Sequence, residues 1–408
     1  MITKIFDLNE QFRVVYSKSN SEIAHVGLMV GVGSCDDGIE FAGMSHFIEH
    51  MWFKGTSSRT SKQIVDDIEM LGGDFNAYTS KEETCLHISI LKDSLMVALD
   101  VLSDIYFNSC FPVEELEKER EVILDEIDSY EDSPSELIVD EFEELLFEGM
   151  NLSTPILGTR KSLSKIDFSS MKSFYLKKYF NSKVVLSFVG NISFADFSAL
   201  VMSYFCRTVD PIDNSLLQDE FFETKLHFNV TKNKKTNQSH CILGLKAYPY
   251  TDIRRLPLSI LNNIVGGPQF SSLLSYSLRE NHGLTYTIES TYTPYSKSGV
   301  FMVYFGTDKK KVLKCYDLIR VEFGKVCQST LLQENIEIYK KQILGQLALS
   351  FDNYLSIMIS QAKSVLIFDK VDSFKEITRK VNSIDSKILK DVANDILLFD
   401  KMSFLQYC

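Results

Sequence analysis

Two kinds of hydrophobic pattern alternate along the chain. Short apolar runs of strand length, such as residues 24–32 and 240–247, are followed by segments with an apolar residue at every third or fourth position, such as residues 94–107. The first pattern predicts buried strands and the second predicts amphipathic helices. Since both patterns recur throughout the chain, the sequence predicts an α+β fold.

The order of these segments is similar in the two halves of the chain. In the first half a strand at 24–32 precedes a helix, a strand at 74–80, the strand CLHISIL and the helix at 94–107. In the second half the strand at 240–247 begins the same series, at an offset of roughly 210 to 215 residues. This repetition indicates a duplicated domain. The alternative is the ordinary alternation of strands and helices in an α+β protein.

We therefore predict two similar domains, each a mainly antiparallel sheet with helices packed on one face. The first domain is predicted at residues 1–208 and the second at 224–408, joined by a polar linker at 209–223. Each domain is expected to close on an apolar strand, since YFNSKVVLSFVG resembles LLFDKMSFLQYC at the C-terminus.

Composition narrows the class of protein. The 408 residues are 45% hydrophobic and 24% charged, which indicates a globular chain. The net charge of −12 disfavours nucleic acid and anionic membrane as partners. Residues 114–148 contain sixteen acidic and two basic residues, a local −14, so the other residues sum to about +2.

The sequence also suggests a compartment. The apolar runs are far shorter than the roughly 20 residues that cross a bilayer. The start, MITKIFDLNEQF, lacks the basic and apolar regions of a signal peptide. The eight cysteines include no CxxC pair and are expected to be reduced. We therefore expect a cytoplasmic protein without a membrane partner.

The segment HFIEH, His46 to His50, carries the strongest chemical signal. On a helix, His46 and His50 lie one turn apart on one face, with Glu49 beside them. Two imidazoles can bind one Zn²⁺ while the carboxylate reaches a water on the metal. The order HxxEH is the inverse of the commoner zinc motif HExxH. The alternative is a helix with two surface histidines.

A catalytic zinc needs a third protein ligand, and an acidic helix downstream can supply it. In ELEKEREVILDEIDSYED, Glu119 and Glu126 are two helical turns apart on one face. Taken alone, this helix could simply present a solvated charged face.

Three segments, HFIEHMWFKGT, NAYTSKEET and EREVILDEI, resemble in order and spacing the pitrilysin/insulinase-type inverzincin metallopeptidases, and most of all the small, two-domain, processing-peptidase-like members. The resemblance runs from about residue 10 to the C-terminus. It implies that His46, His50 and Glu126 bind one Zn²⁺ per chain. It also implies that Glu49 is the general base and that Glu119 is a carboxylate beside the ligands.

This resemblance predicts a zinc endopeptidase or oligopeptidase that cleaves unfolded, basic peptides in a closed chamber. Glu49 would take a proton from the zinc-bound water as it attacks the scissile carbonyl, and would deliver that proton to the leaving nitrogen. In the second half, Arg279 and Tyr286 of LRENHGLTYTI resemble the family's Arg/Tyr pair, which serves the active site. The tyrosine can donate to an oxyanion and the guanidinium can hold the substrate backbone. The alternative is a buried tyrosine and a surface arginine.

Further residues are implied as substrate-binding. The strand with Asn76, Ala77 and Tyr78 resembles the family's edge strand, to which a peptide adds as another strand. Phe53 and Tyr78 are candidate apolar pocket walls that flank the scissile bond. Two acidic residues, four apart on a helix, match positions at which processing-peptidase relatives are thought to read an arginine before the cut; they are Glu136 and Asp140. A solvated acidic face is the alternative for this pair.

Two other functions compete with peptidase activity. A non-catalytic peptide-binding or assembly subunit of the same fold would not need the ligands, the base and the Arg/Tyr pair in one chain. A small-molecule hydrolase of the zinc-deaminase type would need a pair of closely spaced cysteines, which this sequence lacks. Because two domains are half of the four-domain clamshell of long relatives, the resemblance implies a homodimer, with a heterodimer as the alternative.

Overall fold

The computed structural model describes residues 2–206, 227–328 and 330–408, so the predicted linker at 209–223 lies outside the described residues. The chain divides into two compact units. Unit 1 comprises Met1–Asp128, Thr154–Glu220 and Ser350–Val371, and unit 2 comprises Ser129–Ser153, Phe221–Leu349 and Asp372–Cys408. Each unit therefore takes one segment from the other half of the chain, and the predicted domain boundaries stay a prediction.

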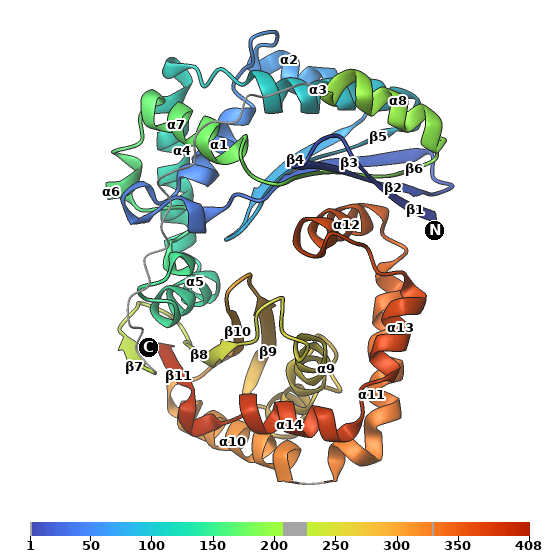
Figure 1. Ribbon diagram of the computed structural model, residues 1–408. Coiled ribbons are helices and arrows are strands. Elements are labelled where there is room, and N and C mark those ends of the chain that lie inside the picture. The colour runs from blue at the N-terminus through green and yellow to red at the C-terminus, as the bar shows by residue number, and fades with distance from the viewer. Residues whose placement is uncertain (1, 207–226, 329) are drawn as a thin grey trace. The chain divides into compact units, whose positions relative to one another are not determined.

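Unit 1 contains a six-stranded sheet in the order β1-β2-β6-β3-β5-β4 (Figure 1). Its strands are β1 (Ile2–Asp7), β2 (Phe12–Lys18), β3 (Ile23–Val30), β4 (Asp74–Thr79), β5 (Thr84–Leu91) and β6 (Val184–Gly190). Neighbours are antiparallel except β2 and β6. Strand β4 is an edge of the sheet, as the sequence predicts.

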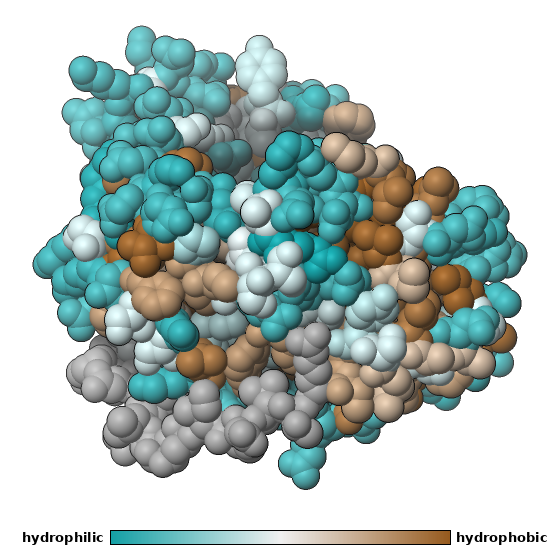
Figure 2. Space-filling model, turned by 90° about the horizontal axis from the view of Figure 1, so that it is seen from above, coloured by the Kyte–Doolittle hydropathy of each residue, from teal (hydrophilic) through white to brown (hydrophobic). Residues whose placement is uncertain are grey.

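Helices cover one face of this sheet, and α3 and α8 lie there side by side (Figure 1). The helices are α1 (Met44–Trp52), α2 (Ser61–Glu69), α3 (Leu95–Asn108), α4 (Val113–Glu131), α6 (Arg160–Leu163), α7 (Phe168–Phe174) and α8 (Phe194–Phe205). Alternate strand residues such as Val14, Leu28 and Leu86 join Phe47 and Ile48 of α1 in the main core. Figure 2 shows that the outer surface of this helical layer mixes hydrophilic and hydrophobic side chains.

The other face of the sheet is covered by a helix from the second half of the chain, α12 (Tyr354–Phe368). The strand residues that alternate with the main core, among them Val15 and Met29, pack against Ala362 and Val365 of α12. The Ser187 hydroxyl of β6 also donates to the Met358 carbonyl, at 2.7 Å.

Unit 2 contains a five-stranded sheet in the order β7-β11-β8-β10-β9. Its strands are β7 (Asn229–Lys232), β8 (Ser239–Ala247), β9 (Thr285–Pro294), β10 (Gly299–Thr307) and β11 (Ser403–Tyr407). Its helices are α5 (Pro134–Leu146), α9 (Arg255–Gly266), α10 (Val312–Gln328), α11 (Leu331–Ser350), α13 (Phe374–Asn382) and α14 (Ser386–Ile396). Helix α5, which belongs to the first half of the chain, packs on β8 and β11.

The two sheets share one plan. Strands β2, β6, β3, β5 and β4 follow one another as β7, β11, β8, β10 and β9 do, and the single parallel pair, β2 with β6 or β7 with β11, is in the same place. The predicted α+β class with two similar, mainly antiparallel domains is confirmed. To the predicted helices on one face, the structure adds a helix on the other. Within the described residues, no helix is long and apolar enough to cross a membrane.

Candidate metal centre

Helix α1 presents the HxxEH residues because its apolar positions fix its orientation. Met44, Phe47, Ile48 and Met51 recur with helical spacing and are buried. The start of the helix has no cap from its own residue, Gly43, and is instead held by Asp37 of the preceding loop. This carboxylate accepts from the backbone N–H groups of residues 43 and 45, both at 3.0 Å, and from the Ser45 hydroxyl at 2.6 Å. The loop thereby fixes α1 at the end nearest His46.

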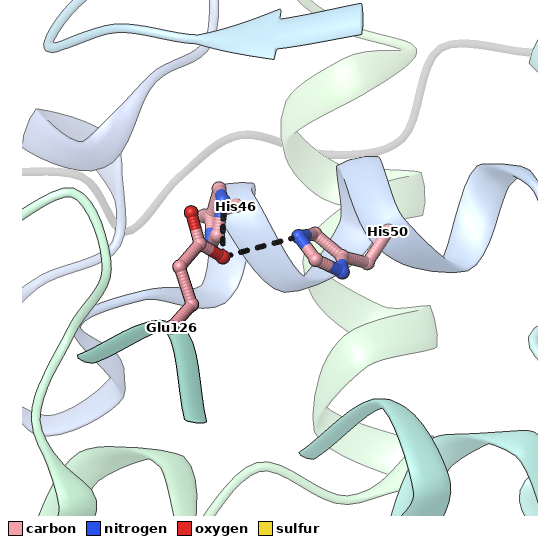
Figure 3. Close-up of side chains that lie close together, drawn as sticks. All are labelled: His46, His50 and Glu126. Carbon is pink, nitrogen blue, oxygen red and sulfur yellow. Dashed lines mark ion pairs between the residues drawn. The ribbon is translucent and has the colours of Figure 1, made fainter. Parts of the chain in front are cut away.

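His46, His50 and Glu126 converge on one point (Figure 3). One carboxylate oxygen of Glu126 lies 3.8 Å from Nε2 of His46 and 3.6 Å from Nε2 of His50. Ligand atoms at the usual Zn–N and Zn–O distances of a tetrahedral site are about 3.4 Å apart. The three side chains therefore have a spacing that suits one zinc ion.

The charges at this point also suit a cation. Burial first, and then the neighbouring His50, lower the pKa of His46 to about 3, so this imidazole is neutral at pH 7. An ion pair with Glu126 is therefore not what holds His46 in place. Instead, imidazole and carboxylate lone pairs face one another, an arrangement that a shared cation stabilises.

Helix α4 is positioned by Arg120. Its guanidinium donates to the backbone carbonyls of Leu163 and Ile166, the latter at 2.8 Å, and lies 5.6 Å from the ring centre of Phe47 in α1. On the same helix, the buried Glu119 accepts a hydrogen bond from Nδ1 of His50 at 3.1 Å. The structure thus brings Glu119 into contact with His50, one of the three candidate ligands.

Glu49 lies between the histidines in sequence and contacts the edge strand. Its carboxylate accepts a hydrogen bond of 2.5 Å from the Thr79 hydroxyl at the end of β4. Burial raises the pKa of Glu49, and the Thr79 hydrogen bond opposes part of this shift. A carboxylate with a raised pKa is better matched to proton transfer near neutral pH.

Three of the predicted substrate-binding residues, Asn76, Ala77 and Tyr78, lie on β4, and Phe53 follows the end of α1. Ala77 faces the main core, together with Phe53, whose ring centre is 4.8 Å from that of Phe75. Tyr78 packs on the opposite face, with the cluster that includes α12. Asn76 is exposed and donates to Asp74 at 2.9 Å. Phe53 and Tyr78 therefore pack in different clusters, and their role as pocket walls stays a prediction.

The remaining predicted residues belong to unit 2. Arg279, on the π-helical segment Ser275–Asn281, lies over the Phe270 ring at 4.8 Å. Tyr286, on β9, is 89% exposed, so the alternative of a buried tyrosine is wrong.

Glu136 and Asp140 lie on α5, where both raise the pKa of Tyr130, after the effect of its burial. Asp140 does so in part through a hydrogen bond with the Tyr130 hydroxyl. Glu136 and Asp140 therefore both act on Tyr130, and their contact with a basic side chain of a substrate stays a prediction.

Two side chains at the site were not singled out from the sequence. Thr79, which contacts Glu49, follows Phe75 and Ala77 with the period of two that marks one face of a strand, and this signal could have found it. Lys54 lies 2.6 Å from Glu119, and no local pattern links residues so far apart in the chain.

Comparison with known proteins identifies the family. A family model described as insulinase (peptidase family M16) matches residues 13–160, and one described as peptidase M16 inactive domain matches residues 165–343. An uncharacterized zinc protease of Bacillus subtilis is 32% identical over 92% of this chain and 90% of its own length. The chain belongs to peptidase family M16.

A second relative and two solved structures are also similar to this chain over most of its length. An uncharacterized zinc protease of Rickettsia felis is 33% identical over 94% of this chain and 92% of its own length. A crystal structure of a peptidase M16 inactive domain from Pseudomonas fluorescens has a TM-score of 0.88 at 21% identity and covers 100% of this chain and 98% of its own. A protease from Helicobacter pylori has a TM-score of 0.89 at 16% identity and covers 100% and 99%. These two structures share the fold.

Proposed function

We propose that this protein is a zinc-dependent endopeptidase or oligopeptidase, with one Zn²⁺ per chain held by His46, His50 and Glu126. The observation that carries the proposal is the convergence of two imidazole nitrogens and one carboxylate oxygen within 4.8 Å. The relatives from Bacillus subtilis and Rickettsia felis are both named zinc protease, and these names support the choice of metal.

A bound zinc would supply Lewis acidity, which polarises a scissile carbonyl and makes an attacking water more acidic. Glu49 then takes the proton of that water and passes it to the leaving nitrogen. Thr79 holds the Glu49 carboxylate and lies at the end of the edge strand β4. A peptide added to β4 as a further strand would therefore run past the base.

The finer parts of the proposal concern assembly and specificity. We propose a cytoplasmic homodimer in which Arg279 and Tyr286 serve a zinc site, and a preference for basic peptides read by Glu136 and Asp140. The exposure of Tyr286 and the proximity of the two acids to one another support these roles.

Metal analysis and hydrolysis of a peptide library test the central proposal. The wild-type protein should hold about one zinc ion per chain, as a site with three protein ligands implies, and should cleave peptides. Glu126→Gln should lose both zinc and hydrolysis. Glu121→Gln, an exposed change on the same helix, is the matched control and should keep both.

Two outcomes contradict this proposal in different ways. Full zinc occupancy in Glu126→Gln would remove Glu126 from the ligands. A wild-type protein that binds zinc and peptides but cleaves none would favour the non-catalytic subunit.

A further inference from the structure

Lys54 lies two residues beyond the end of α1 and reaches the carboxylate that holds His50. Its ammonium nitrogen is 2.6 Å from Oε1 of Glu119, while Oε2 of the same carboxylate accepts from Nδ1 of His50 at 3.1 Å. The two oxygens of Glu119 therefore have different partners. Lys54, Glu119 and His50 form a chain of contacts that ends at the proposed zinc site.

Burial makes this contact important for Glu119. The residue is only 6% exposed, and a carboxylate removed from water is costly unless an opposite charge compensates it. Among the described residues, Lys54 is the one lysine or arginine that forms an ion pair with Glu119. Without Lys54, the carboxylate would lose its compensating charge and one of its two fixed contacts.

The backbone on both sides of Lys54 is fixed. The Lys54 N–H donates to the Met51 carbonyl at 3.1 Å and so continues the last turn of α1. Gly55, with φ of +143°, then turns the chain in a conformation that other residues rarely adopt. The following loop is held by Arg59, whose guanidinium pairs with Asp104 at 2.8 Å and with Asp67 at 2.9 Å. The ammonium group is thus delivered to Glu119 by a rigid segment.

We propose that Lys54 is a positioning residue for the zinc site and acts through Glu119. It holds the carboxylate where it accepts the Nδ1 proton of His50, which leaves the Nε2 lone pair of that ring for the metal. His50 Nε2 is the atom that lies 3.6 Å from Glu126. This inference rests on the proposed function, since it assumes that His46, His50 and Glu126 bind zinc.

Zinc affinity, measured by competition with a chromophoric chelator on the EDTA-stripped full chain, tests the inference. Lys54→Met should weaken zinc binding by about 10-fold, the lower end of the effects seen for groups that orient metal ligands. Lys54→Arg, which keeps the charge, should recover most of that loss. Lys118→Met, an exposed lysine beside Glu119 on α4, is the control and should bind zinc as the wild type does.

A double-mutant cycle separates this role from a merely structural one. In a Glu119→Gln background, Lys54→Met should add little further loss of zinc affinity, because the group through which it acts has changed. If the two changes were instead fully additive, or if Lys54→Met alone bound zinc as the wild type does, the inference would be overturned.

The outcomes also separate this inference from the proposed function. A wild-type chain that binds no zinc would overturn both, whereas normal zinc binding by Lys54→Met overturns only the role of Lys54. If Lys54→Met does not fold, as judged by circular dichroism, Lys54→Gln takes its place and the same outcomes apply.

Discussion

The two units place different chemistry on the same frame. In unit 1, helix α1 brings two imidazoles and helix α4 brings one carboxylate to one point, where acceptor lone pairs face one another. In unit 2, the corresponding helix α9 contributes Asn263 to a ring of three side-chain amides, whose other members are Gln269, just beyond the end of α9, and Gln346 of α11. Asn263 donates to Gln346 at 2.6 Å, Gln346 donates to Gln269 at 2.9 Å, and Gln269 donates back to Asn263 at 3.0 Å.

This difference lies in the side chains and not in the fold. The sheets have the same strand order, so the fold alone does not distinguish a metal site from a structural one. Amides carry donors and acceptors in equal measure and can close a network without a ligand, whereas imidazole nitrogens and a carboxylate oxygen that face one another are stabilised by a shared cation. We therefore expect changes in unit 1 to affect metal and chemistry, and changes in unit 2 to affect the use of substrate.

The sharpest test of this contrast is to change Glu49, the proposed general base. Glu49→Gln should keep zinc and lose about 10² to 10⁴-fold in kcat, as removal of a general base does. The measurement is zinc content together with peptide turnover. Glu69→Gln, on the neighbouring helix α2, is exposed and serves as the control. Near-normal turnover in Glu49→Gln would end its assignment as the base.

A change of Tyr286 in unit 2 should reduce the rate of peptide hydrolysis without changing the zinc content. Tyr286→Phe should lower kcat by roughly 10² to 10³-fold, the range for removal of one oxyanion donor, with zinc content unchanged. Tyr276→Phe, another exposed tyrosine of unit 2, is the control.

Mixing chains tests whether Tyr286 acts on a partner's site. If each zinc site takes its tyrosine from the other chain, a dimer of one Glu49→Gln and one Tyr286→Phe chain has one intact site. Random 1:1 mixing should then restore about a quarter of wild-type activity, because about half of the two-fold dimers are mixed. No recovery, with mixed dimers shown to form, would place Tyr286 in the same chain as its zinc site or deny it a role.

Helix α5 comes from the first half of the chain and lies in unit 2, whereas α12 comes from the second half and lies in unit 1. These two helices differ in charge. Helix α5 carries five acidic residues and no basic one, whereas its counterpart α12 carries Lys363 alone. If α5 reads basic substrates, changing Glu136 and Asp140 to Lys should lower kcat/KM by about 10-fold for basic peptides, the value of one or two charge-assisted contacts.

Neutral peptides are the internal control for this variant and should change little. The difference should shrink as salt rises, because exposed charges are screened. Equal cleavage of acidic and basic peptide pools by the wild-type enzyme would return the acidic helix to a solvated surface.

Local periodicity predicted most of the fold and the core of the site. The strand predicted at 74–80 is β4, Asp74–Thr79, and the helix predicted at 94–107 is α3, Leu95–Asn108. The spacing of His46 and His50 was sufficient because one helix fixes both. The sequence did not predict that α12 packs in unit 1 and α5 in unit 2. The hydrogen bond between Ser187 and Met358 of α12, for example, joins residues 171 apart in the chain, and no local pattern encodes such a contact.

The smallest expected effect is a difference in acid sensitivity. Burial lowers the pKa of His25, His46 and His87 in unit 1 and that of His240 in unit 2. The neighbouring histidines add to the shifts of His25 and His46. The folded protein therefore keeps these side chains neutral to a lower pH than the unfolded chain does, since the unfolded chain takes up protons near the ordinary pKa of histidine.

The sign of the effect follows from this difference in proton uptake. The stabilising contribution falls as the pH drops through the ordinary histidine pKa of about 6.5, because the unfolded state then binds more protons than the folded state. For His46, whose folded pKa of about 3 is far lower, the loss between pH 7 and pH 6 is less than about 1 kcal/mol. Hydrogen exchange of the metal-free protein at these two pH values, corrected for intrinsic rates, should therefore show a larger loss of protection in β3 and β5 than in β8 and β10. Equal losses in the two sheets would mean that the buried histidines of unit 1 do not set its response to acid.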